Sequence, residues 1–155
     1  MGVDTEMAAF EIRDTCAQEN FQAFMKTLGP ETLRNFDHFD WDNSYKTFYV
    51  YEDKKIIAYG FLRSSPHRFK QHLCVLGMVV ADSHQGKGVG TYLGKEMIYW
   101  AQKMMYSKIA LGVYADNINA MRFYEKLGFV TEGILHKEEL RKGEFRDLIT
   151  MAMYL

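Results

Sequence analysis

Residues 73–90 read LCVLGMVVADSHQGKGVG, and this stretch decides the fold. Residues 73–80 form an apolar run that predicts a central strand buried on both faces. The run leads into QGKGVG at residues 85–90, and the pattern after these glycines predicts a helix. Unpaired backbone N–H groups and the positive end of the helix dipole therefore meet at the glycines. That combination favours the binding of a phosphate group.

The three glycines, Gly86, Gly88 and Gly90, suit such a site. Glycine permits a positive φ angle and lets an anion approach the main chain without a Cβ in the way. Lys87 adds a positive charge beside them. An ordinary strand-to-helix turn would explain the same residues, but glycines at the start of a helix cost stability unless a close approach requires them. We therefore interpret residues 85–90 as a phosphate-binding loop.

Two common phosphate-binding motifs do not fit this loop. A Walker A motif requires Ser or Thr after Gly-Lys, but Gly86-Lys87 is followed by Gly88. A Rossmann fingerprint, GxGxxG, would place its third glycine at Leu93, and Gly94 comes one residue late. The spacing therefore rejects a P-loop NTPase and disfavours a dinucleotide site.

The residues after the loop predict a mixture of helices and strands. Apolar residues recur at helical spacing behind Gly88, at Val89, Leu93, Met97, Trp100 and Met104. We expect strands at 109–114, 129–139 and 145–154, a hairpin turn at 141–144, and a short helix at 117–127 that Gly128 ends.

The residues before the loop predict an antiparallel front half. Residues 47–51 and 56–62 are aromatic and β-branched strands joined by a polar turn. Further elements are expected as a short strand at 10–13, a helix at about 16–28 that stops at Gly29-Pro30, and a second helical piece at 31–36. The order of elements indicates an α/β (α+β) fold.

Length and composition indicate a single domain over residues 1–155. Apolar residues make up 48% and charged residues 25%, close to the averages of globular proteins, and no linker or repeat divides the chain. A formal net charge of −1 gives no basic footprint for nucleic acid, and no apolar run approaches the roughly 20 residues of a membrane helix. We expect no nucleic-acid partner, no membrane partner and a cytoplasmic location.

The cysteines and histidines do not indicate a metal site. Cys16 and Cys74 lie far apart and outside any CxxC pattern, which suits a reducing cytosol. No pair of the five histidines has HxxxH spacing. We therefore expect no bound metal.

Two motifs resemble the GNAT superfamily of acetyl-CoA-dependent N-acetyltransferases. The loop Gln85-x-x-Gly88-x-Gly90 resembles the superfamily's (Arg/Gln)xxGx(Gly/Ala) acetyl-CoA loop. Residues 117–129, NINAMRFYEKLGF, resemble its second signature. The similarity covers residues 75–155 well, whereas residues 1–70 agree only in the order of elements.

The resemblance implies a fold and a place for the co-substrate. The GNAT fold has a mixed, mostly antiparallel central sheet of about seven strands, flanked by about four helices. The sheet is splayed between its fourth and fifth strands, here residues 73–80 and 109–114, and the pantetheine arm of acetyl-CoA lies in the gap like an added strand. The cofactor-binding residues that the resemblance implies are Met78, Val80, Gln85, Gly86, Lys87, Gly88, Val89, Gly90, Asn117 and Tyr124.

Asn117 and Tyr124 also fit purely structural roles. Asn117 is among the best helix N-cap residues, and capping is compatible with a contact to pantetheine. Tyr124 suits the core side of an amphipathic helix, but the resemblance places its hydroxyl near the cofactor sulfur, where the leaving thiolate needs a proton. We expect Tyr124 to be the catalytic acid.

The general base is not identified by the sequence. Some superfamily members have a glutamate at the position that Cys74 occupies here, and a cysteine in an apolar strand has a raised pKa and makes a poor nucleophile. We expect Cys74 to be a core residue. His72 and His84 lie near the ends of the central strand, but most lone histidines are surface residues. They receive no catalytic assignment.

These observations predict direct attack of a primary amine on the thioester in a ternary complex. The expected acceptor is a small-molecule amine, and residues 36–42, FDHFDWD, either recognise a cationic amine or form a solvated loop. Acetylation of a protein N-terminus or lysine stays open, as does a non-catalytic CoA-binding module. The expected state is a monomer or homodimer.

Overall fold

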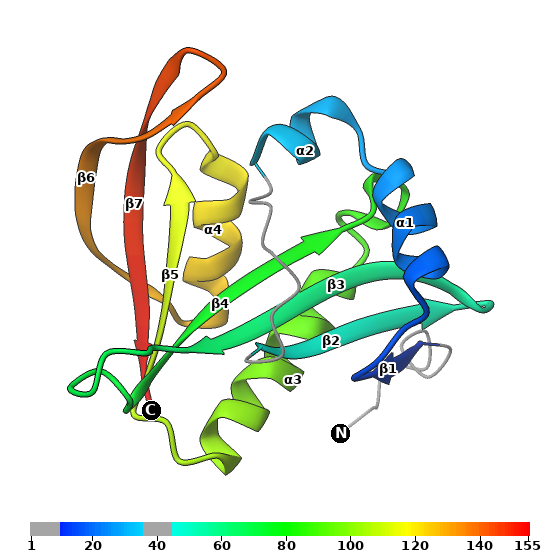
Figure 1. Ribbon diagram of the computed structural model, residues 1–155, viewed down its shortest axis with the longest axis horizontal. Coiled ribbons are helices and arrows are strands. Elements are labelled where there is room, and N and C mark those ends of the chain that lie inside the picture. The colour runs from blue at the N-terminus through cyan, green and yellow to red at the C-terminus, as the bar shows by residue number, and fades with distance from the viewer. Residues whose placement is uncertain (1–9, 36–44) are drawn as a thin grey trace.

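The computed structural model describes residues 10–35 and 45–155, which form a seven-stranded sheet in the order β1-β2-β3-β4-β5-β7-β6 (Figure 1). The strands are β1 Glu11–Arg13, β2 Tyr45–Glu52, β3 Lys55–Ser64, β4 Leu73–Val80, β5 Lys108–Tyr114, β6 Val130–Arg141 and β7 Glu144–Tyr154. The helices are α1 Gln18–Lys26, α2 Pro30–Asn35, α3 Val89–Lys103 and α4 Ile118–Leu127, with a 3-10 turn at Asp82–His84.

The predicted elements are present, and the mixed, mostly antiparallel sheet with four helices is confirmed. The differences lie at element ends. The helix expected at 16–28 is shorter, because Thr27 caps α1 with a hydroxyl bond of 2.6 Å to the Phe24 carbonyl. Strand β6 runs on to Arg141, because Lys142 and Gly143, with φ angles of 50° and 79°, suffice for the hairpin turn. Phe36, expected at the end of the second helix, lies outside the described residues.

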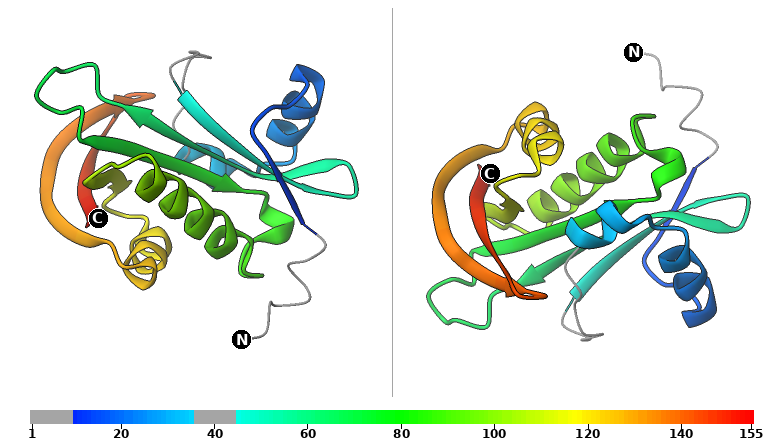
Figure 2. Two further views of the ribbon diagram at one scale, coloured as in Figure 1. Left: turned by 90° about the horizontal axis from the view of Figure 1, so that it is seen from below. Right: turned by 90° about the horizontal axis from the view of Figure 1, so that it is seen from above.

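Two apolar clusters hold the helices to the sheet. The larger one buries the inner face of α3, including Leu93 and Met97, against the central strands. The smaller one buries Phe21 and Phe24 of α1 against strands β2 and β3. Figure 2 shows α3 and α1 on opposite faces of the sheet. The central strands are therefore covered on both sides, as the unbroken apolar run predicts.

The sheet opens between β4 and β5, which run parallel. These strands pair only from Leu73, opposite Lys108, to Val75, opposite Ala110. Beyond that point β5 continues to pair with β7, while residues 76–80 of β4 keep only β3 as a neighbour. The two strands diverge visibly in Figure 1. Backbone groups of residues 76–80 that point toward β5 therefore form an internal sheet edge.

A glycine in β4 lies directly against an aromatic ring of β3. Gly77 lies opposite Phe61 in the register of β3 and β4, and a Cβ on Gly77 would lie 2.3 Å from the Phe61 ring. The ring therefore occupies the space that a side chain would need.

We expect Gly77→Ala to lower the free energy of unfolding by about 1–3 kcal/mol, because the Phe61 ring must leave its rotamer. Gly133→Ala in β6 is the matched control, since its nearest neighbour, the Thr150 hydroxyl, would be 3.7 Å away. Urea unfolding of both variants measures the difference. Equal stabilities would contradict the packing described for β3 and β4.

Candidate active site

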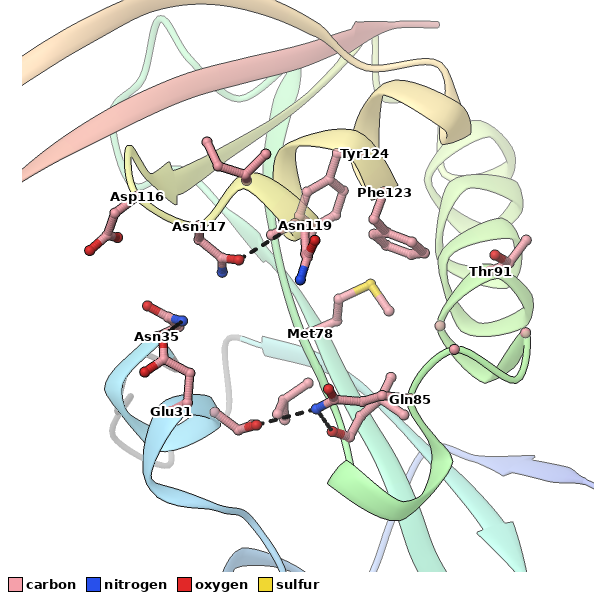
Figure 3. Close-up of a pocket in the computed structure, with 18 residues that line it drawn as sticks. Glu31, Asn35, Met78, Gln85, Thr91, Asp116, Asn117, Asn119, Phe123 and Tyr124 are labelled. Carbon is pink, nitrogen blue, oxygen red and sulfur yellow. Dashed lines mark hydrogen bonds between the residues drawn. The ribbon is translucent and has the colours of Figure 1, made fainter.

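A cleft of about 800 Å³ lies where β4 and β5 part. Its walls come from the end of β4, the glycine loop, the first turns of α3 and α4, and α2 (Figure 3). The residues expected from the sequence that line it are Met78, Val80, Gln85, Gly86, Gly88, Gly90, Asn117 and Tyr124. Segments far apart in the sequence thus converge on one cavity.

The remaining two expected residues, Lys87 and Val89, do not line the cleft. Lys87 is exposed on the loop. Val89 is fully buried, and its side chain packs in the larger apolar cluster. Neither the side chain nor the backbone of Val89 is therefore exposed in the free protein.

The glycine loop has the backbone geometry that the sequence predicts. Gly86 and Gly88 have φ angles of 72° and 84°, which L side chains rarely adopt. Gly88 is the N-cap of α3, and no side chain among the described residues caps this helix. A Cβ on Gly90 would lie 3.3 Å from the Phe123 ring of α4. The first N–H groups of α3 therefore stay without helical acceptors at the cleft.

The Gln85 side chain is bound within the protein. Its Nε2 donates to the Val80 carbonyl at 3.1 Å and to the Thr32 hydroxyl of α2 at 3.2 Å. Gln85 thereby connects the loop to the end of β4 and to α2. The sequence pattern predicts Gln85 in the loop but does not indicate these two bonds.

Asn117 caps α4, as expected. Its Oδ1 accepts a hydrogen bond of 3.2 Å from the Ala120 N–H. The Asn117 side chain also lines the cleft, and Figure 3 shows its amide nitrogen on the cleft side. Capping therefore leaves the amide N–H groups available to a ligand.

Tyr124 lies on the inner side of α4 and is only 8% exposed. Its ring packs edge-on against Phe123 and Phe129, with centroids 5.1 and 5.6 Å away. Burial raises the pKa of the phenol above its ordinary value, which already lies well above neutral pH. Tyr124 is therefore a packed aromatic residue with a protonated hydroxyl, and it lines the cleft.

Cys74 and the two histidines lie away from the cleft lining. Cys74 is fully buried, and burial raises the pKa of its thiol to about 11, as expected for a core cysteine. His84 contacts Glu52 at 3.0 Å, and His72 is exposed. No cluster of His, Cys, Asp and Glu that could hold a metal ion occurs within residues 10–35 and 45–155.

The wall formed by α2 and Asp116 carries residues that the sequence did not point to. Glu31, Thr32 and Asn35 of α2 line the cleft together with Asp116. Burial tends to raise the pKa of Asp116, but hydrogen bonds from Arg146 and Arg34 outweigh it, so the pKa is lowered. Asp116 is therefore held as a paired carboxylate. The run at 36–42 expected near the acceptor lies outside the described residues.

The sequence matches a known protein family over most of its length. Residues 9–129 match the Acetyltransferase (GNAT) family. The crystal structure of an acetyltransferase of the GNAT family from Streptococcus pneumoniae superposes with a TM-score of 0.77. It is 21% identical, and the superposition covers 94% of this chain and 99% of that one, which shows a shared fold.

Curated relatives match over parts of their length. The L-amino acid N-acetyltransferase AaaT of Escherichia coli K12 is 34% identical over 84 residues, which cover 54% of this chain and 52% of that protein. The spermidine N(1)-acetyltransferase of Vibrio cholerae serotype O1 is 30% identical over 111 residues, which cover 71% of this chain and 64% of that protein. The chain thus spans about half to two thirds of these relatives. Within the described residues, no helix combines the length and apolar character needed to cross a bilayer.

We expect the Cys74 thiol to resist alkylation in the folded protein, because it is buried and its pKa is raised to about 11. Cys16, which is half-buried, is the internal control. Mass spectrometry after treatment with iodoacetamide at neutral pH should find the label on Cys16 first. Equal labelling of both cysteines would contradict the inert role of Cys74.

Proposed function

The chain belongs to the GNAT acetyltransferase family, and from that premise we propose that it is an enzyme that transfers an acetyl group from acetyl-CoA to a primary amine. One observation carries this proposal: the internal edge of β4, the uncapped start of α3 and the Tyr124 phenol meet in one cleft. Residues 1–155 would form a single acetyltransferase domain that acts in the cytoplasm.

The cleft fits acetyl-CoA chemically. The backbone N–H groups of residues 86–90 match the charge of a pyrophosphate, since they lie at a helix start and the glycines leave room for close approach. The open edge at residues 76–80 matches the amide groups of pantetheine, which would pair with it as a strand does. When bound, acetyl-CoA supplies an activated acetyl group and a thiolate leaving group.

Individual residues take roles that follow from their positions. Main-chain groups of Met78 and Val80 would bind the acetyl carbonyl and the pantetheine amides, with an N–H stabilising negative charge on the carbonyl oxygen. Gln85, Gly86, Gly88 and Gly90 would hold the pyrophosphate through the loop backbone. The backbone N–H of Val89 would join them.

The side chains of Asn117 and Lys87 would add to these main-chain contacts. The Asn117 amide would contact the pantetheine arm while its Oδ1 caps α4. Lys87 does not line the cleft, and it would add a positive charge to the loop from the solvent side.

The proton chemistry rests on Tyr124. Its hydroxyl is protonated at neutral pH, and it belongs to the cleft lining. We infer that it would donate this proton to the departing sulfur. Transfer would be direct, because Cys74 is buried away from the cleft. Asp116 makes a poor base, since two arginines hold its carboxylate, so water would carry the amine's proton away.

The acceptor would be a small-molecule amine. The relatives described above are named for acetylation of L-amino acids and of spermidine, which supports this class. No metal is required for the transfer that we propose, since main-chain N–H groups supply the electrophilic stabilisation.

If the loop binds the pyrophosphate, Gly88→Glu should abolish CoA binding in calorimetry by steric block and charge repulsion. Gly90→Glu should behave in the same way. Gly143→Glu is a matched control, because Gly143 also has a positive φ angle, 79°, but lies in the β6–β7 turn. A folded Gly88→Glu variant with the CoA affinity of the wild type would remove the basis of the proposal.

Tyr124→Phe keeps the ring and its packing but deletes the proton, so kcat should fall by roughly 10²-fold with CoA affinity unchanged. Tyr106→Phe serves as the control, since its hydroxyl pairs with Ser64 away from the cleft. Steady-state kinetics where chemistry limits the rate measure both. Wild-type turnover in Tyr124→Phe would leave Tyr124 with packing as its only role.

A further inference from the structure

Helix α2 forms a wall of the cleft although little apolar contact holds it there. Glu31, Thr32 and Asn35 line the cavity, and none of the six residues of α2 is fully buried. Leu33 is half-buried and packs on the smaller apolar cluster. A helix this short is not stable by itself. The position of this wall therefore depends on polar contacts made by α2.

One end of α2 is attached next to the glycine loop. The Asp82 carboxylate accepts hydrogen bonds from the Gly29 N–H at 3.1 Å and from the Thr32 hydroxyl at 2.9 Å. Gln85 adds its bond to Thr32. This end of the helix is fixed beside the proposed pyrophosphate site.

The other end of α2 is attached through Arg146 of β7. The Arg146 side chain is 4% exposed. Its guanidinium donates to the Arg34 carbonyl at 2.9 Å, to Asn35 Oδ1 at 2.9 Å and to Asp116 Oδ1 at 2.7 Å. It also lies 3.4 Å from the centroid of the Tyr114 ring. One planar group thus joins the last residues of α2 to the turn that precedes Asn117.

The topology explains why β7 supplies this group. Pairing of β5 with β7 ends at Tyr114, opposite Leu148, so Arg146 lies beyond the end of β5. There its side chain reaches the space between α2 and the β5–α4 turn. Arg34 supports the same junction from α2, with bonds to Asp116 at 3.0 Å and to Glu144 at 3.1 Å.

Stability alone is a weak reason for this arrangement. The Arg146 side chain is buried, but the side chain of its partner Asp116 is 54% exposed, and an ion pair with a solvent-exposed partner adds little stability. A planar guanidinium with three fixed acceptors does, however, define direction, which a lysine or an apolar residue cannot do. The arrangement of the Arg146 guanidinium and its three acceptors therefore suits the placement of α2 across from Asn117.

We propose that Arg146 is a positioning residue that sets α2 as the acceptor-side wall of the cleft, an inference that rests on the proposed acetyl transfer. Its contacts lie at the Asn35 and Asp116 end, whereas the glycine loop lies at the other end of α2. Loss of the hydrogen bonds of the Arg146 guanidinium should therefore disturb the binding of the amine and leave the binding of CoA intact.

The test compares Arg146→Met and Arg146→Lys with Asp147→Asn. Asp147 is the neighbour of Arg146 on β7, and its side chain bonds His136 and Lys137 across the hairpin instead of α2. The acceptor is whichever of spermidine and the common L-amino acids the wild type acetylates fastest. We expect the KM for this amine to rise about tenfold or more in both Arg146 variants, with kcat less affected and the CoA Kd from calorimetry unchanged. Asp147→Asn should keep all three values.

Hydrogen exchange of the free protein gives a second readout that needs no turnover. Amides of residues 30–35 should exchange faster in the Arg146 variants, while those of α3 stay protected. If Arg146→Met does not fold, Arg146→Lys and Asp116→Asn make the same test. Unchanged exchange in α2, or equal losses of amine and CoA binding, would overturn the inference. A wild-type chain that fails to bind CoA would instead contradict the proposed function.

Discussion

The rest of the structure depends on the incomplete pairing of β4 with β5. A buried strand normally has its backbone groups paired on both sides, because unpaired N–H and C=O groups away from water cost free energy. Here residues 76–80 have β3 on one side and the cleft on the other. The fold therefore keeps a row of backbone donors and acceptors open at the centre of its sheet. We propose that the amide groups of pantetheine complete that row in the way that an added strand would.

The helices that border this opening serve it in different ways. Helix α3 starts at a glycine without a side-chain cap and so presents its positive end, while α4 is capped by Asn117 and places Tyr124 inside the cleft. Helix α2 closes the remaining side and is held mainly by hydrogen bonds and ion pairs. In the proposed function, charge recognition, proton donation and placement of the acceptor would each fall to a different helix around one gap. We expect variants in one helix to affect one of these steps more than the others.

Much of the fold and part of the site could be predicted from the sequence, because they rest on local rules. The glycine spacing at 86–90 and the N-cap at Asn117 reflect backbone conformations and hydrogen bonds that involve only residues a few positions apart. The wall around Arg146 could not be predicted in this way. It joins residues more than a hundred positions apart, such as Arg34 and Arg146, and no local pattern in the sequence relates the two. The same holds for Lys87, which is exposed to solvent, and Val89, which is buried in the core, so that neither lines the cleft that their loop borders.

We propose that the open edge of β4 and the glycine loop form one binding site for CoA. Titration of the isotope-labelled protein with CoA, monitored through backbone amide chemical shifts, locates this site. We expect saturable shifts that concentrate at residues 76–80, 85–91 and 117–120, with little change in β1, β2 and α1. Shifts that concentrate elsewhere, or the absence of a saturable response at these three segments, would contradict it.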